Sequence, residues 1–207
     1  MTKTFIHLRT QSSYSLAEST LKIKNLVNLA KKNQMPALAI TDNNNMFGVF
    51  EFAQECIYNN IQPIIGTSIN LNDVEVKGKF SQLSFLVKNE IGYRNLLKLS
   101  SLSHLSKTKN VGINLEEIKD YCDGLYCFVG GEYNPLLLLN LDQKNQKIQN
   151  LIKTLKMYYG ENLLFEIQRI NNELIDGFEN QFIDLSIKYN ISLIASNNVK
   201  YGYSEDY

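Results

Sequence analysis

Apolar and polar residues follow two different periods along this chain, and the two periods take turns. Short, mostly apolar stretches such as 35–42 and 124–130 have the length and composition of buried β-strands. Between them, apolar residues recur every three or four positions, as on one face of an α-helix. Alternation of this kind is typical of α/β proteins with parallel, buried strands. The pattern therefore predicts an α/β fold.

Seven strands are expected in these 207 residues, which fits a small barrel at least as well as an open sheet. The expected strands are residues 4–10, 35–42, 62–71, 81–89, 124–130, 162–169 and 191–198. The expected helices are 19–34, 46–60, 90–105, 114–121, 143–160 with Gly160 as its C-cap, and 172–190. Residues 70–80 are expected to form a surface turn or hairpin. Any site is expected in the loops at the carboxyl ends of the strands.

Composition limits what the chain can do. With 44% hydrophobic residues, residues 1–207 can form one core, so a single domain is expected. Lys plus Arg and Asp plus Glu both number 21, which gives a formal net charge of zero. No overall basic field is present to attract nucleic acid, so any contact with DNA must be local or made elsewhere.

The cysteines and the ends of the chain indicate an intracellular setting. Cys56, Cys122 and Cys127 show neither a zinc spacing nor a redox pair, so reduced core residues are expected. No signal peptide is evident, and the apolar runs are far shorter than the ~20 residues of a membrane span. A cytoplasmic protein without membrane contact is predicted. The last residues carry no capping Gly or polar tail, which indicates a piece of a longer chain.

The first expected strand raises the question of metal binding. His7 and Arg9 stand two positions apart, so in a strand both side chains would leave the same face. Two histidines in this arrangement would suit a metal enzyme, but arginine does not bind metal ions.

Several segments in sequence order resemble the PHP (polymerase and histidinol phosphatase) domain that begins the alpha subunits of bacterial replicative DNA polymerase III. The resemblance covers the whole chain and rests on FIHLRTQSSYSLAES, MPALAITDNNNMFGVFEF, IQPIIGTSINL, VKNEIGYRNLLKLSS and IASNNVKY. It implies a distorted (β/α)7 barrel of the PHP type. In metal-binding members, His, Asp, Glu and sometimes Cys ligands lie at one mouth of this barrel.

Position by position, the resemblance implies that this chain has lost most of those ligands. The second histidine of the first motif is Arg9, and the histidine of a Thr-Asp-His motif is Asn43. Glu18 replaces a shorter acid and could still coordinate. The vestigial positions are His7, Arg9, Glu18, Asn43, Ser68, Gln82, Gly131, Asn198 and Lys200. The two remaining donors, His7 and Glu18, are too few for a catalytic metal cluster, so no metal, cofactor or catalytic residue is predicted here.

The replacements also predict an electrostatic arrangement. Arg9, with Lys200 as a second candidate, is expected to pair with Glu18 or Asp42, so that side-chain cations replace the charge of the lost metals. Simpler interpretations remain open. His7 is a half-buried structural histidine or a ligand, and Asp42 organises a turn or caps the next helix. His104 is expected to be structural or exposed, and the aromatic stretches 46–52 and 156–165 are expected in the core rather than stacked on bases.

The resemblance implies a function through a longer parent chain. That parent would be a DNA-directed DNA polymerase with magnesium in a later domain, and DNA would be bound there rather than by this domain. Residues 1–207 would support the polymerase without catalysis and dock the proofreading exonuclease subunit within the replisome. Two alternatives stay open: a metal-dependent phosphoesterase of the PHP family, and a stand-alone interaction module.

Overall fold

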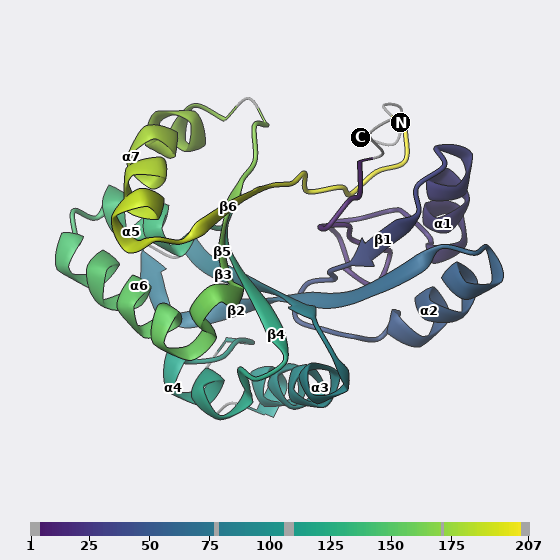
Figure 1. Cartoon of the computed structure of the whole chain (residues 1–207), viewed down its shortest axis with the longest axis horizontal. Helices are drawn as coiled ribbons and strands as arrows, with labels where there is room; N and C mark the ends of the chain where they lie inside the picture. Colours follow the sequence, from purple (N-terminus) through teal and green to yellow (C-terminus); the bar gives the residue numbers. More distant parts are fainter. Residues whose placement is uncertain (1–4, 77–78, 106–109, 171, 204–207) are drawn as a thin grey trace.

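Six strands form one curled sheet in the order β1 to β6, with helices along its outside (Figure 1). The computed structural model describes residues 5–76, 79–105, 110–170 and 172–203. The strands are β1 (Ala37–Ile40), β2 (Gln62–Val76), β3 (Lys79–Val87), β4 (Leu125–Gly130), β5 (Leu163–Ile167) and β6 (Ser192–Ala195). The α-helices are α1 (Ile23–Lys32), α2 (Val49–Tyr58), α3 (Glu90–Leu105), α4 (Leu115–Ile118), α5 (Pro135–Leu141), α6 (Asn145–Tyr159) and α7 (Glu173–Tyr189). Two short 3₁₀ helices are η1 (Lys119–Tyr121) and η2 (Gly160–Asn162).

The sheet is mixed, so the expectation of an all-parallel sheet is wrong. β1 and β2 are parallel, as are β4, β5 and β6, whereas β3 runs antiparallel to both of its neighbours. The cause is a hairpin, one of the two possibilities predicted for residues 70–80: Val76 pairs with Lys79, and a connection this short cannot carry a crossover. Residues 77–78 at its tip lie outside the described residues. The α/β class and the barrel-like curl of the sheet agree with the expected fold.

The first predicted strand, residues 4–10, is not a regular strand, and residue 4 lies outside the described part. The backbone bends at Leu8. The carbonyl of Ala39 in β1 accepts a hydrogen bond from the Thr10 hydroxyl, whereas in a regular β-ladder it would accept one from a backbone N–H. The segment nevertheless lies between β1 and the chain that follows β6. Thr41 N donates to Thr10 O (2.7 Å), and Gln11 N donates to Val199 O (2.9 Å). Six regular strands and this irregular segment therefore occupy the place of the seven expected strands.

Two main apolar clusters hold the helices against the sheet. The smaller lies between β1, α1 and α2, and the larger lies among β2 to β5 and helices α3 to α7. Helix α5 was not predicted, because its leucine-rich sequence is buried on all sides and shows no helical period. Its start could have been found: Asn134 accepts a hydrogen bond from Leu136 N, and Pro135 occupies the first turn.

Three smaller predictions can be compared with the structure. Gly160 is the C-cap of α6, as predicted. The cysteines are free; Cys56 and Cys127 are buried, but Cys122 is only half-buried. Burial raises the pKa of Cys56 to about 12, so its thiol is protonated and unreactive at neutral pH. Among the described residues, no helix has both the length and the apolar character needed to cross a lipid bilayer.

The aromatic stretch 46–52 is only partly in the core. Phe52 is fully buried as predicted, whereas Phe47 and Phe50 are 71% and 73% exposed. The prediction is wrong for these two residues. Phe47 precedes α2, and Phe50 lies on its outer side; sequence period alone cannot show which side of a helix is covered. In the stretch 156–165, Tyr159, Leu163 and Phe165 are buried as expected, whereas Met157 is 71% exposed.

Candidate functional site

A buried ion pair lies at the mouth of the barrel, at the carboxyl ends of the strands. Arg9 Nη1 is 3.0 Å from Glu166 Oε2, and both side chains are almost fully buried. Arg9 Nη2 donates to Ser68 Oγ (3.2 Å), which in turn bonds Ser84 Oγ (2.9 Å). The guanidinium group therefore links the irregular first segment to β2, β3 and β5. A planar group with several donors is suited to such a bridge.

Glu166 is held by further side chains. Its Oε1 accepts hydrogen bonds from Ser196 Oγ and from Gln168 Nε2, the latter at 3.1 Å. The prediction that Arg9 pairs with Glu18 or Asp42 is therefore wrong in its partner, although Arg9 does pair with a carboxylate. Sequence reasoning missed Glu166. The available signal was a charged residue inside the apolar strand β5, because a buried carboxylate requires a partner.

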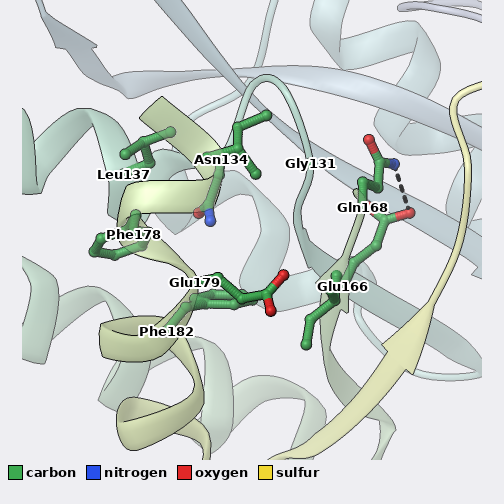
Figure 2. A pocket seen from close by; sticks show the side chains of 10 residues that line it. Gly131, Asn134, Leu137, Glu166, Gln168, Phe178, Glu179 and Phe182 are labelled. Carbon is green, nitrogen blue, oxygen red and sulfur yellow. Dashed lines mark hydrogen bonds between the residues drawn. The ribbon is translucent and has the colours of Figure 1, made fainter. Parts of the chain in front are cut away.

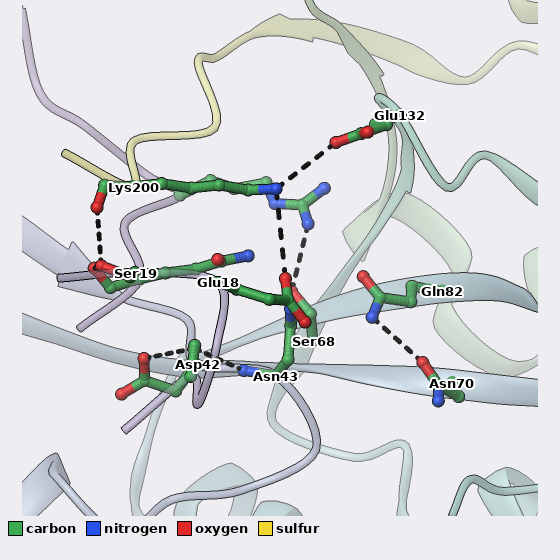
Figure 3. Close-up of polar contacts among 12 residues, drawn as sticks. Glu18, Ser19, Asp42, Asn43, Ser68, Asn70, Gln82, Glu132 and Lys200 are labelled. Atoms are coloured by element: carbon green, nitrogen blue, oxygen red, sulfur yellow. Dashed lines mark hydrogen bonds and ion pairs between the residues drawn. The ribbon is translucent and has the colours of Figure 1, made fainter. Parts of the chain in front are cut away.

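A second cation lies at the rim of the mouth. Figure 3 shows Lys200 extending between Glu18 and Glu132, with Nζ–Oε2 distances of 4.0 Å and 3.6 Å. Glu18 Oε2 also accepts a hydrogen bond from Asn43 Nδ2 (2.5 Å). The predicted pairing of Lys200 with Glu18 is therefore present. All these groups are partly exposed, so the ion pairs contribute little to stability.

Asp42 organises the loop 12–15, one of the two simpler roles predicted for it. Its Oδ1 accepts hydrogen bonds from Ser12 N (2.6 Å) and Ser15 Oγ (2.7 Å), and its Oδ2 accepts one from Ser12 Oγ (2.7 Å). Burial raises the pKa of Asp42, and the hydrogen bonds from Ser15 and Ser12 oppose that rise. The side chain is thus bound by donors rather than by a cation.

This arrangement makes a prediction about two substitutions. Asp42→Ala should lower the free energy of unfolding by about 2–3 kcal/mol, because Ser12 N–H stays buried without its acceptor. Asp42→Asn should cost less than about 1 kcal/mol, since the amide oxygen can accept from Ser12 N while Nδ2 donates to Ser12 Oγ. Urea unfolding of both variants measures the difference. Equal losses would mean that the negative charge, not hydrogen bonding, is what the loop requires.

His7 and Arg9 do not share a face, because the segment that carries them is not a strand. Arg9 points toward β5, whereas His7 lines a pocket with Leu26 and Ala30 of α1. The His7 ring meets Phe5 edge to face, with centroids 4.9 Å apart. Burial lowers the pKa of His7, so its neutral form is favoured. His7 is thus separated from the carboxylates at the mouth, in agreement with a structural role.

The remaining vestigial positions bring neutral oxygens to the mouth. Gln82 Nε2 donates to Asn70 Oδ1 (3.0 Å), and Gly131 adopts a positive φ of 69° beside Gln168. Buried side-chain atoms without a hydrogen-bond partner in the described structure include Arg9 Nε, Asn43 Oδ1, Gln82 Oε1, Gln168 Oε1 and Asn198 Oδ1. Amide oxygens are poor ligands for transition metals. These positions therefore add neutral oxygens to the mouth, and its carboxylates, Glu18, Glu132 and Glu166, form ion pairs with Lys200 and Arg9.

Within the described ranges, no three His, Cys, Asp or Glu side chains lie together in a way that could hold a metal ion. The carboxylate of Glu166, on β5, is buried and already bonded to Arg9, Ser196 and Gln168. The residues present therefore do not fit the metal cluster that the resemblance implies for active members.

A small cavity adjoins the buried ion pair. It lies between the end of β5 and the helices α5 and α7, and Figure 2 shows Glu166 and Gln168 on one side with Phe178 and Phe182 on the other. About 20 Å³ is free in it, which is room for roughly one water molecule. A phosphate ester would not fit, so this cavity is not a substrate site.

Comparison with known families and sequences found matches over most of the chain. Residues 7–170 match the PHP domain family. DNA polymerase III subunit alpha of Rickettsia bellii (strain RML369-C) is 36% identical over 200 residues, which cover 94% of this chain and 17% of the relative. The same subunit of Borreliella burgdorferi is 34% identical over 214 residues (98% and 18%), and that of Pseudomonas aeruginosa is 29% identical over 209 residues (100% and 18%). The chain therefore spans less than a fifth of the length of these relatives.

Two solved structures share the fold at low sequence identity. An amidohydrolase from Chromobacterium violaceum, with bound sulfate and no metal, has a TM-score of 0.62 at 12% identity and covers 97% of this chain and 89% of its own. A protein from Bifidobacterium adolescentis described as a metal-dependent phosphoesterase has a TM-score of 0.53 at 12% identity, with 94% and 87% covered. At this identity the likeness concerns the fold alone.

Proposed function

This chain belongs to the PHP domain family, and from that premise we propose that it is a non-catalytic PHP domain of a bacterial DNA polymerase III alpha subunit. In this role it supports the polymerase region of the same polypeptide and docks the proofreading exonuclease subunit in the cytoplasmic replisome. Template-directed DNA synthesis, with magnesium and DNA bound in a later domain, belongs to the parent chain. The relatives that match nearly all of this chain are alpha subunits more than five times as long, which supports the proposal.

The Arg9–Glu166 ion pair is the observation that carries the non-catalytic part. Arg9 brings a permanent positive charge to a barrel mouth where a metal enzyme needs ligands, and its partner carboxylate is fully engaged. Lys200 places a second ammonium group between Glu18 and Glu132. Two fixed cations among three carboxylates offset the charge that would otherwise attract divalent ions. The function that remains for the mouth is to hold the barrel closed.

A phosphoesterase assay tests this against the metal-dependent alternative. Turnover of p-nitrophenyl phosphate and of a DNA 3′ end should equal the buffer rate with and without added Mn²⁺. Arg9→His should stay equally inactive, because one restored ligand cannot complete a site that needs at least three around each ion. Chelator-sensitive turnover together with stoichiometric bound metal would instead favour the phosphoesterase. A gene that encodes no polymerase region after Tyr207 would contradict the proposal and favour the third possibility, a stand-alone interaction module.

A further inference from the structure

Helix α2 is apolar on two opposite sides. Its inner side packs Val49, Phe52 and Cys56 into the smaller core. Its outer side carries Phe50 and Ile57, 73% and 67% exposed, followed by Tyr58 at 85%. Positions 50, 57 and 58 lie on one helical face because residues seven or eight apart are two turns apart. Gln54 lies between these side chains, and Glu51 and Glu55 lie at the edge of the group, so the outer side of α2 is an apolar patch with polar neighbours. Exposed apolar patches bordered by polar residues mark interaction sites.

Two further exposed apolar side chains belong to segments that adjoin the start of the helix. Phe47 directly precedes α2, and Leu16 in the loop before Glu18 is 83% exposed. The Tyr14 ring lies against Gly48, and its hydroxyl donates to Glu51 Oε2 (3.1 Å), which fixes the loop beside the start of the helix. We call Leu16, Phe47, Phe50, Ile57 and Tyr58 the α2 face. In Figure 1, α2 lies with α1 at one side of the molecule, away from α3 to α7.

The chemistry of the α2 face indicates a protein surface as its partner. Phe and Tyr are enriched in the buried centres of protein interfaces, and clustered exposed apolar side chains mark interaction sites. Nucleic acid is disfavoured, because α2 contains no Lys or Arg and carries Glu51 and Glu55 beside the aromatic side chains. The partner must therefore supply apolar side chains rather than phosphates.

We propose that the α2 face is the surface on which another domain of the same polypeptide packs. The inference rests on the proposed function, since it requires a longer chain. In the relatives that match this chain, the match covers only 17–18% of the length, so more than four-fifths of each relative lies outside the matched part. A domain joined through the chain meets this face at high effective concentration, so an apolar contact of moderate size is sufficient to keep it covered.

Alkylation of introduced cysteines tests which protein covers the face. Phe50→Cys and Ile57→Cys are made in the full-length polypeptide and in the 1–207 fragment, and the maleimide reaction rate at each site is measured by peptide mass spectrometry. Met157→Cys on α6 is the matched control, because Met157 is 71% exposed on a helix outside the α2 face. Both α2 sites should react at least tenfold more slowly in the full-length chain than in the fragment, and Met157→Cys should react equally in the two.

Each other outcome overturns the proposal in a distinguishable way. Equal rates at the α2 sites in both proteins would show that no domain covers the face. Protection of the full-length chain only after the purified exonuclease subunit is added would assign the face to that subunit. Protection in the fragment that grows with its concentration would assign it to a second copy. A downstream region without polymerase activity would refute the proposed function while leaving the protection measurement valid.

Discussion

Arg9→Met is expected to lower the free energy of unfolding by about 3–5 kcal/mol, because it leaves the Glu166 carboxylate buried without its cation. The ion pair is 3.0 Å long, and the two side chains are 4% and 0% exposed, so water cannot replace the missing partner. Ser68 Oγ also loses the donor that Arg9 Nη2 supplies. Because a typical domain is stable by only 5–15 kcal/mol, a loss of this size removes a large share of its stability. Urea unfolding measures it.

A second substitution separates the cost of a lone charge from the value of the pair. Arg9→Met combined with Glu166→Gln removes both charges and keeps an oxygen that can accept from Ser196 and Gln168. This double variant should recover most of the loss and stay within about 1–2 kcal/mol of the wild type. Arg94→Met, which breaks an exposed pair with Glu90, is the control and should change stability by less than about 0.5 kcal/mol. A double variant as unstable as Arg9→Met would contradict this explanation.

Gly92→Ala is expected to cost about 3 kcal/mol through a backbone clash. A Cβ atom on Gly92, in the first turn of α3, would lie 1.8 Å from the carbonyl oxygen of Gly124, just before β4. That oxygen also accepts a hydrogen bond from Lys88 N (2.8 Å), so it cannot turn away freely. The helix would have to move off the sheet, which disturbs the packing of the larger core. The midpoint of thermal unfolding should fall accordingly.

Gly177 provides the matched control, because among the described residues it is the other glycine that lies inside an α-helix. It is exposed on α7, and a Cβ atom there would have no neighbour within 4 Å. Gly177→Ala should therefore raise stability by about 0.5–1 kcal/mol, because alanine loses less backbone entropy in a helix. If Gly92→Ala were as well tolerated as Gly177→Ala, that result would contradict the close contact between α3 and the Gly124 carbonyl.

Local pattern predicted most elements of the fold but not how the strands pair. The helix at 90–105 and the strand at 124–130 appear at nearly the expected bounds, because their periods are strong and their ends are marked. The parallel expectation failed at β3, where a hairpin sets the direction of the strand. The segment 4–10 failed for another reason: its alternation suits a strand, but a bend at Leu8 and the Thr10 hydroxyl replace the regular ladder.

At the site, too, the sequence indicated individual residues but not the contacts between residues far apart in the chain. Arg9 could be singled out because a cation stood where the resemblance implies a ligand, and the Lys200–Glu18 pair could be predicted in the same way. The true partner of Arg9 lies 157 residues away, and a single sequence does not show which buried carboxylate a distant cation will meet. Burial of Glu166 in an apolar strand signalled only that some partner was required.

Primer extension by the full-length polypeptide is the measurement that tests the central claim, that the Arg9–Glu166 pair at the barrel mouth contributes to the protein's activity only by stabilising its fold. Arg9→Met should lose activity in proportion to the protein that unfolds, and Arg9→Met with Glu166→Gln should extend primers at the wild-type rate per folded molecule. A double variant that is folded yet does not extend primers would contradict the claim.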